Sequence, residues 1–465
     1  MEKRQDRRSH DSLYEVWKTC VDFFRNYKSW TNAQFIIVLL LAVALSMGGN
    51  LLVRAVQGSK ETSPSSQTTT SGKSKENQSG ETTARIMANG DLLYHIPIYR
   101  TALKEDGTYD FHENFEYVKP WLKQADLVIG DFEGTVNKDH YLAGYPLFNA
   151  PGEVMDAIKD AGYQVLDLAH NHILDSQIEG VVSTAQAIEK AGMTPIGVYT
   201  KEPRDKSPIV IKEVNGIKVA LLAYSYGFNG IEQSISQEDY NRYLSDLNED
   251  KMKAEIERAE KEADITVIMP QMGIEYQLEP TEEQKTLYHK MIDWGADIIF
   301  GGHPHVVEPA ETVEKDGDKK LIIYSMGNLL SNQVKEVMGN DKSQRGTIIE
   351  AVLKKDASGR LMIEDVLSHP VWVQRTEKDA AADAAGNAAS GKSGTEKSTG
   401  KKTAAKSKSA AKLYDIKTLL CTDYMEGGPN QDQVGDSERE AIKAAYEAVQ
   451  KTVSADGEGS VWKNR

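Results

Sequence analysis

Short apolar runs that end in polar residues recur along this chain, and they limit the folds it can adopt. The run Asp297-Ile298-Ile299-Phe300 leads into Gly301-Gly302-His303-Pro304-His305, and similar runs precede Asp91, Asp131 and His170. Buried strands of α/β folds commonly carry functional groups in the loops at their carboxyl ends. The pattern therefore predicts an α/β fold with a polar site assembled from several strand ends.

The loop Gly301 to His305 presents two imidazoles one residue apart. Its glycines allow backbone conformations that other residues avoid, and Pro304 fixes φ between the two rings, which lowers the entropy cost of presenting both to one ion. A lone His-x-His is also common in ordinary loops, so a metal site requires further ligands nearby.

Carboxylates at two other strand ends are candidates for those ligands. Asp91 follows a short strand, Arg85 to Ala88, although an aspartate there is often only a turn former. Asp131 and Glu133 follow a second strand and lie on the same side if that strand continues, so either or both can reach the point at which Asp91 aims. One such carboxylate could bridge two metals, and we take Asp131 as a catalytic candidate. His95 either approaches the same site or lines its mouth.

The densest polar cluster, His170-Asn171-His172, follows the predicted strand Gln164 to Leu168. An Asn carbonyl and a His nitrogen are both acceptable metal ligands, and a His beside the metal can donate a proton to a leaving oxygen. Asp175 is expected to be the N-cap of the next helix, which runs to Ala191.

Local patterns predict the remaining elements. Asn215-Gly216 between two β-rich runs indicates a hairpin with a type I′ turn, and Thr281-Glu282-Glu283-Gln284 fits a capping box. We expect helices over 153–160, 247–263 and from Thr281 to Trp294, and strands over 209–214, 217–224, 264–269, 321–325, 346–353 and 361–367.

An uncharged run from Ala33 to Val53 is long enough to cross a bilayer, because about 20 helical residues span a hydrocarbon core of roughly 30 Å. Basic residues are concentrated before this run, so the positive-inside rule places residues 1–32 in the cytoplasm and nearly everything after residue 53 outside. The rival interpretation is a cleaved signal peptide, but some thirty residues before the apolar core is long for one. Cys20 and Cys421 then lie on opposite sides of the membrane and cannot pair.

Composition divides the part outside the membrane. Residues 54–83 are rich in Ser, Thr, Gln, Gly and Lys and predict a flexible stalk, and residues 375–412 predict a second low-complexity linker. The folded body is expected over 84–374, followed by a small tail, 413–465, with an amphipathic helix near 437–449. The formal net charge of -15 argues against non-specific nucleic-acid binding, while glycans, peptides or anionic polymers handled through a metal remain open.

Six short motifs occur in the order seen in the CapA/PgsA family of capsule and poly-gamma-glutamate synthesis proteins, and the chain resembles that family from Ala84 to about Gln374. They are Gly90-Asp91, Asp131-Phe132-Glu133, His170 to Asp175, Gly273-x-Glu275-Tyr276, Gly302 to His305 and Gly327-Asn328. The family is similar to calcineurin-like metallophosphatases, so the resemblance implies a β-sandwich flanked by helices, with two metals at the strand ends, behind one N-terminal transmembrane helix.

The resemblance also implies roles for individual residues. His172 matches the histidine that assists the leaving group, and His95, Gln271, Glu275, Tyr276 and Asn328 are expected to contact substrate. The expected ligands of one or two divalent transition ions (Mn, Fe or Zn) are Asp91, Glu133, Asn171, His303 and His305. Two positions depart from the phosphatase pattern, because Leu93 and Gln271 stand where an imidazole is usual. These departures leave a weaker set of ligands for a second metal.

Two functions remain open at this point. The first is a metal-dependent hydrolase or transferase of capsule or poly-gamma-glutamate synthesis. The second is a non-catalytic scaffold that binds the growing anionic polymer and guides its export. Both would work with membrane polymer-synthase subunits.

Overall fold

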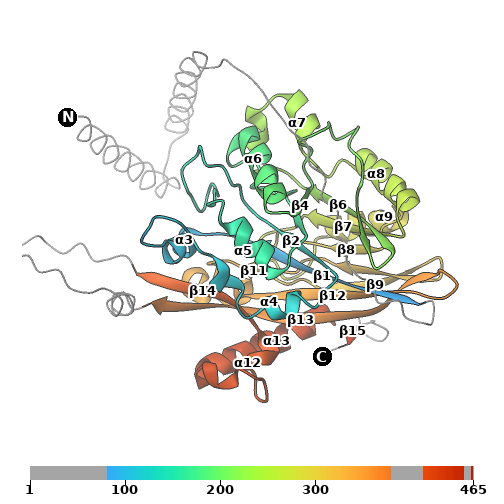
Figure 1. The fold of residues 1–465 in the computed structure, drawn as a ribbon. Helices are drawn as coiled ribbons and strands as arrows, with labels where there is room; N and C mark the ends of the chain where they lie inside the picture. Colours follow the sequence, from blue (N-terminus) through green and yellow to red (C-terminus); the bar gives the residue numbers. More distant parts are fainter. Residues whose placement is uncertain (1–80, 379–411, 455–461, 464–465) are drawn as a thin grey trace, which may run out of the picture. The chain divides into compact units, whose positions relative to one another are not determined.

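A computed structural model of the chain describes residues 81–378, 412–454 and 462–463, all of which belong to one compact unit, Ser74–Arg465. The predicted cytoplasmic segment, the membrane span 33–53 and most of the predicted stalk and linker lie outside these residues. Among the helices that are described, none is long and apolar enough to cross a membrane. The predicted α/β architecture is confirmed, because two mixed sheets are combined with helices (Figure 1).

The larger sheet has nine strands and carries the first three polar strand ends. Strands β1 to β4 are parallel to one another, while β12, β13 and β14 extend the sheet antiparallel beyond β1; β11 pairs with β1 and β15 with β13. Its strands are β1 (Thr82–Leu92), β2 (Leu127–Asp131), β3 (Val165–Asp167), β4 (Thr194–Ile196), β11 (Asn328–Leu330), β12 (Arg345–Lys355), β13 (Leu361–Lys378), β14 (Leu413–Leu420) and β15 (Trp462–Lys463).

The smaller sheet has six strands in the order β5-β6-β7-β8-β10-β9. Its four inner strands are parallel, and β5 and β9 pair antiparallel at the two edges. The strands are β5 (Val210–Val214), β6 (Ile217–Ser225), β7 (Ile265–Gln271), β8 (Ile298–Phe300), β9 (Ala310–Lys315) and β10 (Asp318–Ile323).

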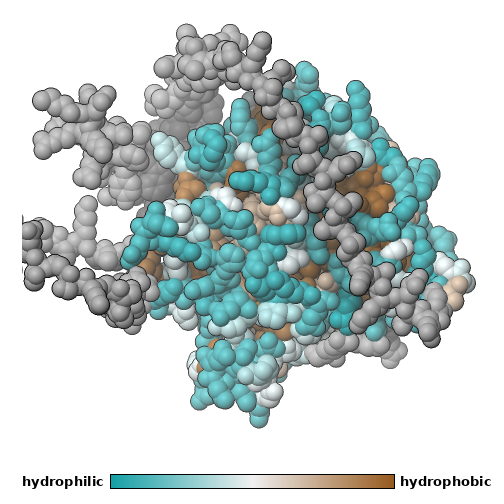
Figure 2. Space-filling model, viewed as in Figure 1, coloured by the Kyte–Doolittle hydropathy of each residue, from teal (hydrophilic) through white to brown (hydrophobic). Residues whose placement is uncertain are grey.

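The two sheets share one apolar core, which is the arrangement of a sandwich. Ile86 and Ile129 from the large sheet belong to the same buried cluster as Leu221 and Val267 from the small one. Because side chains of a strand alternate in direction, the intervening residues face outward: Met87 and Val128 belong to a second cluster, under helices. The face in Figure 2 is mainly hydrophilic, as expected when most apolar side chains are used in such cores.

Helices cover the outer faces of both sheets. Helices α8 and α9 pack on the small sheet, whereas α12 and α13 pack on β13 and β14 on the far side of the large sheet (Figure 1). The α-helices are α3 (Ile96–Ala102), α4 (Lys119–Leu122), α5 (Val154–Ala161), α6 (Gln177–Lys190), α7 (Gln237–Tyr243), α8 (Glu249–Glu262), α9 (Glu282–Trp294), α10 (Lys335–Met338), α12 (Cys421–Tyr424) and α13 (Asp436–Val453). Short 3-10 helices occupy η4 (His112–Phe115), η5 (Ile231–Ser234), η6 (Lys342–Gln344) and η7 (Gln431–Gln433).

Two local predictions are confirmed in detail. Strands β5 and β6 pair antiparallel around Asn215 and Gly216, whose φ angles of 50° and 77° are those a type I′ turn requires. At the start of α9, the Thr281 side chain accepts from the Gln284 backbone and the Gln284 side chain accepts from the Thr281 backbone, which completes the capping box.

Other boundaries differ from the prediction. Strand β1 begins at Thr82, inside the predicted stalk, and β13 continues to Lys378, past the expected end of the body. The predicted tail supplies β14, which pairs with β13 from Val371↔Leu420 to Lys378↔Leu413. A strand that returns to a sheet after a long insertion has no local sequence signal, because its partner is distant in the chain.

Asp175 is not the N-cap of α6, and this prediction was wrong. The helix starts at Gln177 after Ser176, and no side chain caps it. The Asp175 Oδ2 atom instead accepts a hydrogen bond from the Phe148 backbone at 2.5 Å and lies 2.7 Å from His172 Nδ1. The Asp175 carboxylate therefore binds Phe148 from another loop and His172 from the preceding turn, instead of capping the helix.

Candidate metal centre

The polar strand ends of both sheets meet at one place. Asp91 lies near the end of β1, Asp131 ends β2, Asn171 follows β3 and His305 follows β8. The Gly302 backbone lies close to two of these carboxylates: a Cβ atom at Gly302 would be 3.2 Å from Asp131 Oδ2 and 3.5 Å from Asp91 Oδ1. Glycine at this position therefore leaves room for two carboxylates against the backbone of the His-x-His loop.

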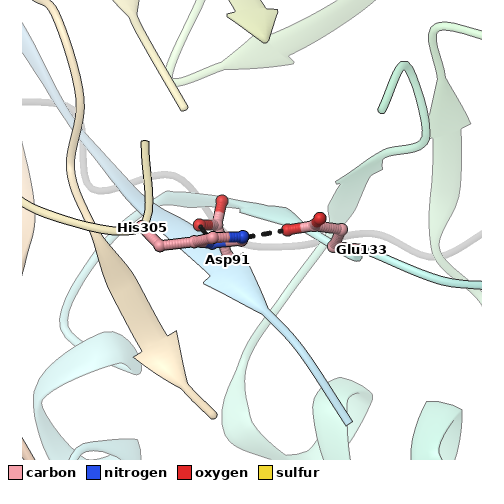
Figure 3. A group of neighbouring side chains, drawn as sticks. All are labelled: Asp91, Glu133 and His305. Atoms are coloured by element: carbon pink, nitrogen blue, oxygen red, sulfur yellow. Dashed lines mark hydrogen bonds and ion pairs between the residues drawn. The ribbon is translucent and has the colours of Figure 1, made fainter. Parts of the chain in front are cut away.

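Among the residues that the structure describes, Asp91, Glu133 and His305 form a group of three side chains close enough to hold one metal ion, and we call it the triad side (Figure 3). One ligand atom from each lies within 4.8 Å of the other two. His305 Nδ1 is 2.7 Å from Asp91 Oδ2 and 3.8 Å from Glu133 Oε2. Two carboxylates and one imidazole at this spacing are a ligand set that suits a divalent cation.

Unpartnered buried atoms test whether a cation fits. Asp91 Oδ1, Asp131 Oδ1, both carboxylate oxygens of Glu133, Asn171 Oδ1 and His303 Nδ1 are all buried without a hydrogen-bond partner. Each buried polar atom left unpaired costs about 1–3 kcal/mol, so native proteins rarely collect them. Most of these atoms are lone-pair donors from strand-end loops, which is the arrangement that a bound cation would satisfy.

Three carboxyl groups of the site have raised pKa values, because they are buried close to one another. Burial raises the pKa of Glu133 to about 7 although His305 opposes the shift, and burial with the Asp91 charge raises that of Asp167 to about 8. Burial and the neighbouring carboxylates of Asp167 and Asp91 raise the pKa of Asp131 well above its ordinary value. A divalent cation would reverse this preference by stabilising the ionised forms.

The two histidines of the His-x-His loop have opposite electrostatic states. Burial opposes protonation of His305, but the charges of Glu133 and Asp91 raise its pKa to about 10. Burial lowers the pKa of His303 to about 3, so this ring is neutral. Both residues adopt positive φ, 95° for His303 and 58° for His305, a backbone strain that is common at functional sites.

His303 lies on the other side of the site with Asn171 and Gln271, and we call these three residues the amide side. The two histidine ring centroids are 6.2 Å apart, and the His303 ring packs 4.5 Å from that of Tyr226. Gln271 is buried, and its Oε1 accepts from the Asn171 backbone N–H at 2.6 Å. Gln271 thus lies behind Asn171 instead of at an open surface.

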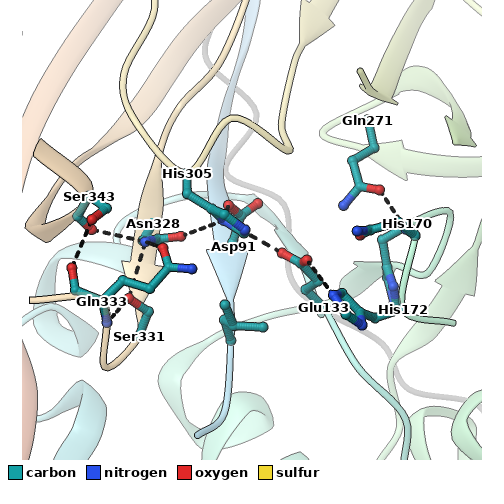
Figure 4. Close-up of polar contacts among 12 residues, drawn as sticks. Asp91, Glu133, His170, His172, Gln271, His305, Asn328, Ser331, Gln333 and Ser343 are labelled. Atoms are coloured by element: carbon teal, nitrogen blue, oxygen red, sulfur yellow. Dashed lines mark hydrogen bonds and ion pairs between the residues drawn. The ribbon is translucent and has the colours of Figure 1, made fainter. Parts of the chain in front are cut away.

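His172 connects the triad side to a carboxylate and an aromatic ring. Its Nε2 is 3.8 Å from Glu133 Oε1, and its Nδ1 is 2.7 Å from Asp175 Oδ2, so Figure 4 shows a chain from Asn328 through His305 and Glu133 to His172. Burial opposes protonation of His172, but the Asp175 hydrogen bond and the Glu133 charge raise its pKa.

The remaining substrate candidates occupy different depths. Asn328 is fully buried, with Oδ1 3.1 Å from His305 Nδ1 and its amide donating to Ser331, Gln333 and Ser343, so it supports His305 from behind (Figure 4).

Three candidates remain nearer the surface. Tyr276 is 38% exposed and accepts from Gln333 Nε2, and its ring lies 5.9 Å from that of His305, at the mouth of the site. Glu275 beside it is exposed, and its charge helps to raise the pKa of His305. The His95 ring lies 5.3 Å from that of Phe148, which in turn packs 4.8 Å from His172.

Sequence reasoning missed Asp167, the contact of Asp175 with His172, and the loop that follows β6. This segment, which we call the loop 225–230, starts at the last residue of β6 and contacts Asn171, His172, Gln271 and His303. An apolar strand followed by Ser225-Tyr226-Gly227-Phe228-Asn229-Gly230 repeats the strand-end pattern of the other loops, and that pattern could have identified it.

Comparison with known proteins identifies relatives of this chain. The chain is 34% identical to the capsule biosynthesis protein CapA of Bacillus anthracis over 47% of this chain and 54% of that protein. It is 28% identical to the PGA biosynthesis protein CapA of Bacillus subtilis (strain 168) over 57% of this chain and 68% of that protein. The chain thus spans about half the length of the first relative and about two thirds of the second.

Among solved structures, a putative 5'-nucleotidase from Staphylococcus aureus in complex with alpha-ketoglutarate aligns with a TM-score of 0.40 and 14% identity, over 62% of this chain and 54% of that one. The family model described as bacterial capsule synthesis protein PGA_cap matches residues 85–333, which contain every proposed metal ligand. This match covers more than half of the sequence, and the chain belongs to the bacterial capsule synthesis protein family PGA_cap.

Proposed function

We propose that this protein acts in the synthesis of a capsule or of poly-gamma-glutamate as a metal-dependent hydrolase or transferase with a metallophosphatase-like body. The observation that supports the metal most directly is the set of buried, unpartnered ligand atoms at the strand ends. Family membership supplies the biological process. We also propose that residues 33–53 anchor the protein in the membrane and that the body lies outside the cell.

Each side chain near the metal has a distinct task in this proposal. Asp91, Glu133 and His305 would hold one divalent transition ion (Mn, Fe or Zn), and Asp131, Asn171 and His303 would take part in binding a second. When bound, the ion would supply Lewis-acid polarisation of the group that is cleaved or transferred. His172, oriented by Asp175 through Nδ1, presents Nε2 as the proton donor for the leaving oxygen. Tyr276 and Glu275 contact the substrate at the mouth.

A non-catalytic scaffold is the second candidate, and two buried residues favour it. Leu93 is buried with the apolar core residues, and Gln271 already bonds to the Asn171 backbone, so neither position supplies the imidazole usual in phosphatases. Without these two imidazoles, the site could bind an anionic polymer through one ion without turnover. In both cases, we propose membrane polymer-synthase subunits as partners.

Two substitutions separate the candidates, measured as surface polymer per cell at matched protein level. His172→Asn removes the proton donor but no proposed ligand, so an enzyme should lose about 10²- to 10⁴-fold in rate and most of its polymer. Asp91→Ala removes a ligand and should impair both an enzyme and a scaffold. His140→Asn is the matched control, because this histidine is exposed on another loop.

Normal polymer with His172→Asn and loss only with Asp91→Ala would refute catalysis and favour the scaffold. The metal itself is tested in purified full-length protein. Elemental analysis should find one or two transition ions per chain in the wild type and at least one fewer in the double variant His303→Ala with His305→Ala; equal contents would refute the ligand assignment.

The proposed topology has its own test. Protease added to intact protoplasts should digest the body and leave a small anchored fragment that contains Cys20. A body that resists digestion until the membrane is opened would exclude the anchored, external arrangement.

A further inference from the structure

The loop 225–230 contacts four of the proposed site residues without supplying a predicted ligand. The Tyr226 ring covers His303 at 4.5 Å, and the Tyr226 backbone donates to the Gln271 carbonyl at 3.1 Å. Asn229 reaches both Asn171 and His172. The loop therefore supports the amide side, where this chain has Gln271 in place of the imidazole usual in phosphatases.

The contact between Asn229 and Asn171 determines which end of the Asn171 side-chain amide is available as a metal ligand. Asn171 Nδ2 donates to Asn229 Oδ1 at 3.2 Å, while the Asn171 backbone N–H donates to Gln271 Oε1 at 2.6 Å. The carbonyl end of the Asn171 amide, Oδ1, is left buried and without a hydrogen-bond partner. Since an amide has one donor end and one acceptor end, holding the nitrogen fixes the oxygen as the end available to a cation.

The loop backbone is built to hold Asn229 in place. Asn229 has φ of 55°, in the left-handed region that Asn and Gly tolerate best, and Gly230 follows with φ of 80°. Phe228 between them and the strand is buried, and its ring packs 5.8 Å from that of Tyr240. Ser225 Oγ also donates to the Gly227 carbonyl at 2.8 Å, which closes the turn.

We propose that Asn229 is a positioning residue that orients the Asn171 side-chain oxygen toward a divalent cation on the amide side. The inference rests on the metal site proposed above and extends it to a second layer of contacts. Groups that orient a metal ligand in this way typically contribute 10- to 100-fold to metal affinity. Asn229 would then partly offset the weaker ligand set on this side.

The test is titration of full-length protein in detergent, stripped with chelator, with Mn²⁺ and with Zn²⁺ by calorimetry. Asn229→Gly keeps the left-handed backbone but removes the amide side chain. It should lower the affinity for the ion that His303→Ala removes by about 10- to 100-fold. Asn229→Asp keeps an oxygen acceptor for Asn171 Nδ2 and should restore most of the affinity. The matched control is Asn215→Gly, because Asn215 also has a left-handed φ, 50°, but lies in the β5-β6 turn.

The outcomes separate this inference from the proposed metal site. If the wild type binds ions that His303→Ala and His305→Ala remove, but Asn229→Gly binds as tightly as Asn215→Gly, the positioning role is refuted and the metal site stands. If the wild type binds no transition ion, the metal site is refuted and the inference falls with it. If Asn229→Gly lowers the melting temperature of the metal-free protein more than Asn215→Gly does, the Asn229→Asp variant is used instead. Weak metal binding by a folded Asn229→Asp variant would contradict the proposal.

Discussion

The triad side and the amide side of the site lie next to each other but are built differently. The triad side places two carboxylates and an imidazole within 4.8 Å, and the charges raise the pKa of its histidine to about 10. The amide side has two amides and one histidine, whose pKa burial lowers to about 3. The first side therefore has negative charge to offer a cation, and the second has mainly neutral oxygen and nitrogen ligands.

For the two ions proposed above, this difference predicts unequal affinities in place of a symmetric pair. Charged ligands bind a divalent ion more strongly than neutral ones in a buried site, because the Coulomb term is large at low dielectric. On the amide side, the hydrogen bonds that Asn171 donates to Gln271 and Asn229 would replace charge as the means of holding this proposed ligand. Three experiments test whether the two sides differ in this way.

The largest expected effect is the loss of metal from the triad side. His305→Ala should lower the affinity of the tighter ion by at least about 100-fold, because it removes one of three closely spaced ligands. His303→Ala should leave that ion in place and remove only a weaker one. Ions per chain, measured by elemental analysis after dialysis, check both, with the exposed His140→Ala as control. Equal losses from the two variants would show that the sides are equivalent.

An intermediate effect is expected in the pH dependence of the metal-free protein. The pKa values of Glu133, raised to about 7, and Asp167, raised to about 8, lie above the unfolded values, so their contribution to stability is present at low pH and lost as pH rises through those values. His305 acts in the same direction up to about pH 10. The pKa values of His303 and His95 are lowered to about 3 and 4. Their contributions to stability are therefore lost only as pH falls below about 6.5.

Between pH 6.5 and 8, these groups together therefore predict falling stability, on the order of 5 kcal/mol in the free energy of unfolding. Urea denaturation with chelator present measures it. Asp167→Asn should flatten the slope while keeping the acceptor for the Ala169 backbone, and saturating Mn²⁺ should abolish it. A metal-free protein that becomes more stable over this range would contradict the assignment of an uncompensated carboxyl cluster.

The smallest effect is expected from strengthening the amide side. Gln271→His introduces an imidazole; one of its nitrogens can accept from the Asn171 backbone N–H while the other faces the site. It should raise the affinity for the more weakly bound ion by about 10-fold, or about 1.4 kcal/mol. Calorimetric titration with Mn²⁺ measures this, and Gln271→Asn, which adds no imidazole, is the control. Unchanged binding in a folded His variant would show that position 271 does not face the ion.

Much of the fold follows from local sequence. The β5-β6 hairpin depends on Asn215-Gly216, and the start of α9 depends on Thr281 and Gln284, so adjacent residues suffice to predict them. The addition of β14 to the large sheet could not be predicted in this way, because its pairing with β13 joins segments separated by residues 379–411. Such pairing is decided by the sheet edge that is available in the folded protein.

Apolar runs followed by polar residues were enough to predict which side chains stand at strand ends. Asp91, Asp131, Glu133, the His170-to-His172 cluster and the His-x-His loop all do so. Their division between the triad side and the amide side could not be predicted from these patterns. His303 and His305 are one residue apart, yet their different backbone angles and neighbours place one beside Tyr226 and the other beside Asp91. Side-chain direction and the electrostatic field come from packing between two sheets, and a linear pattern specifies neither.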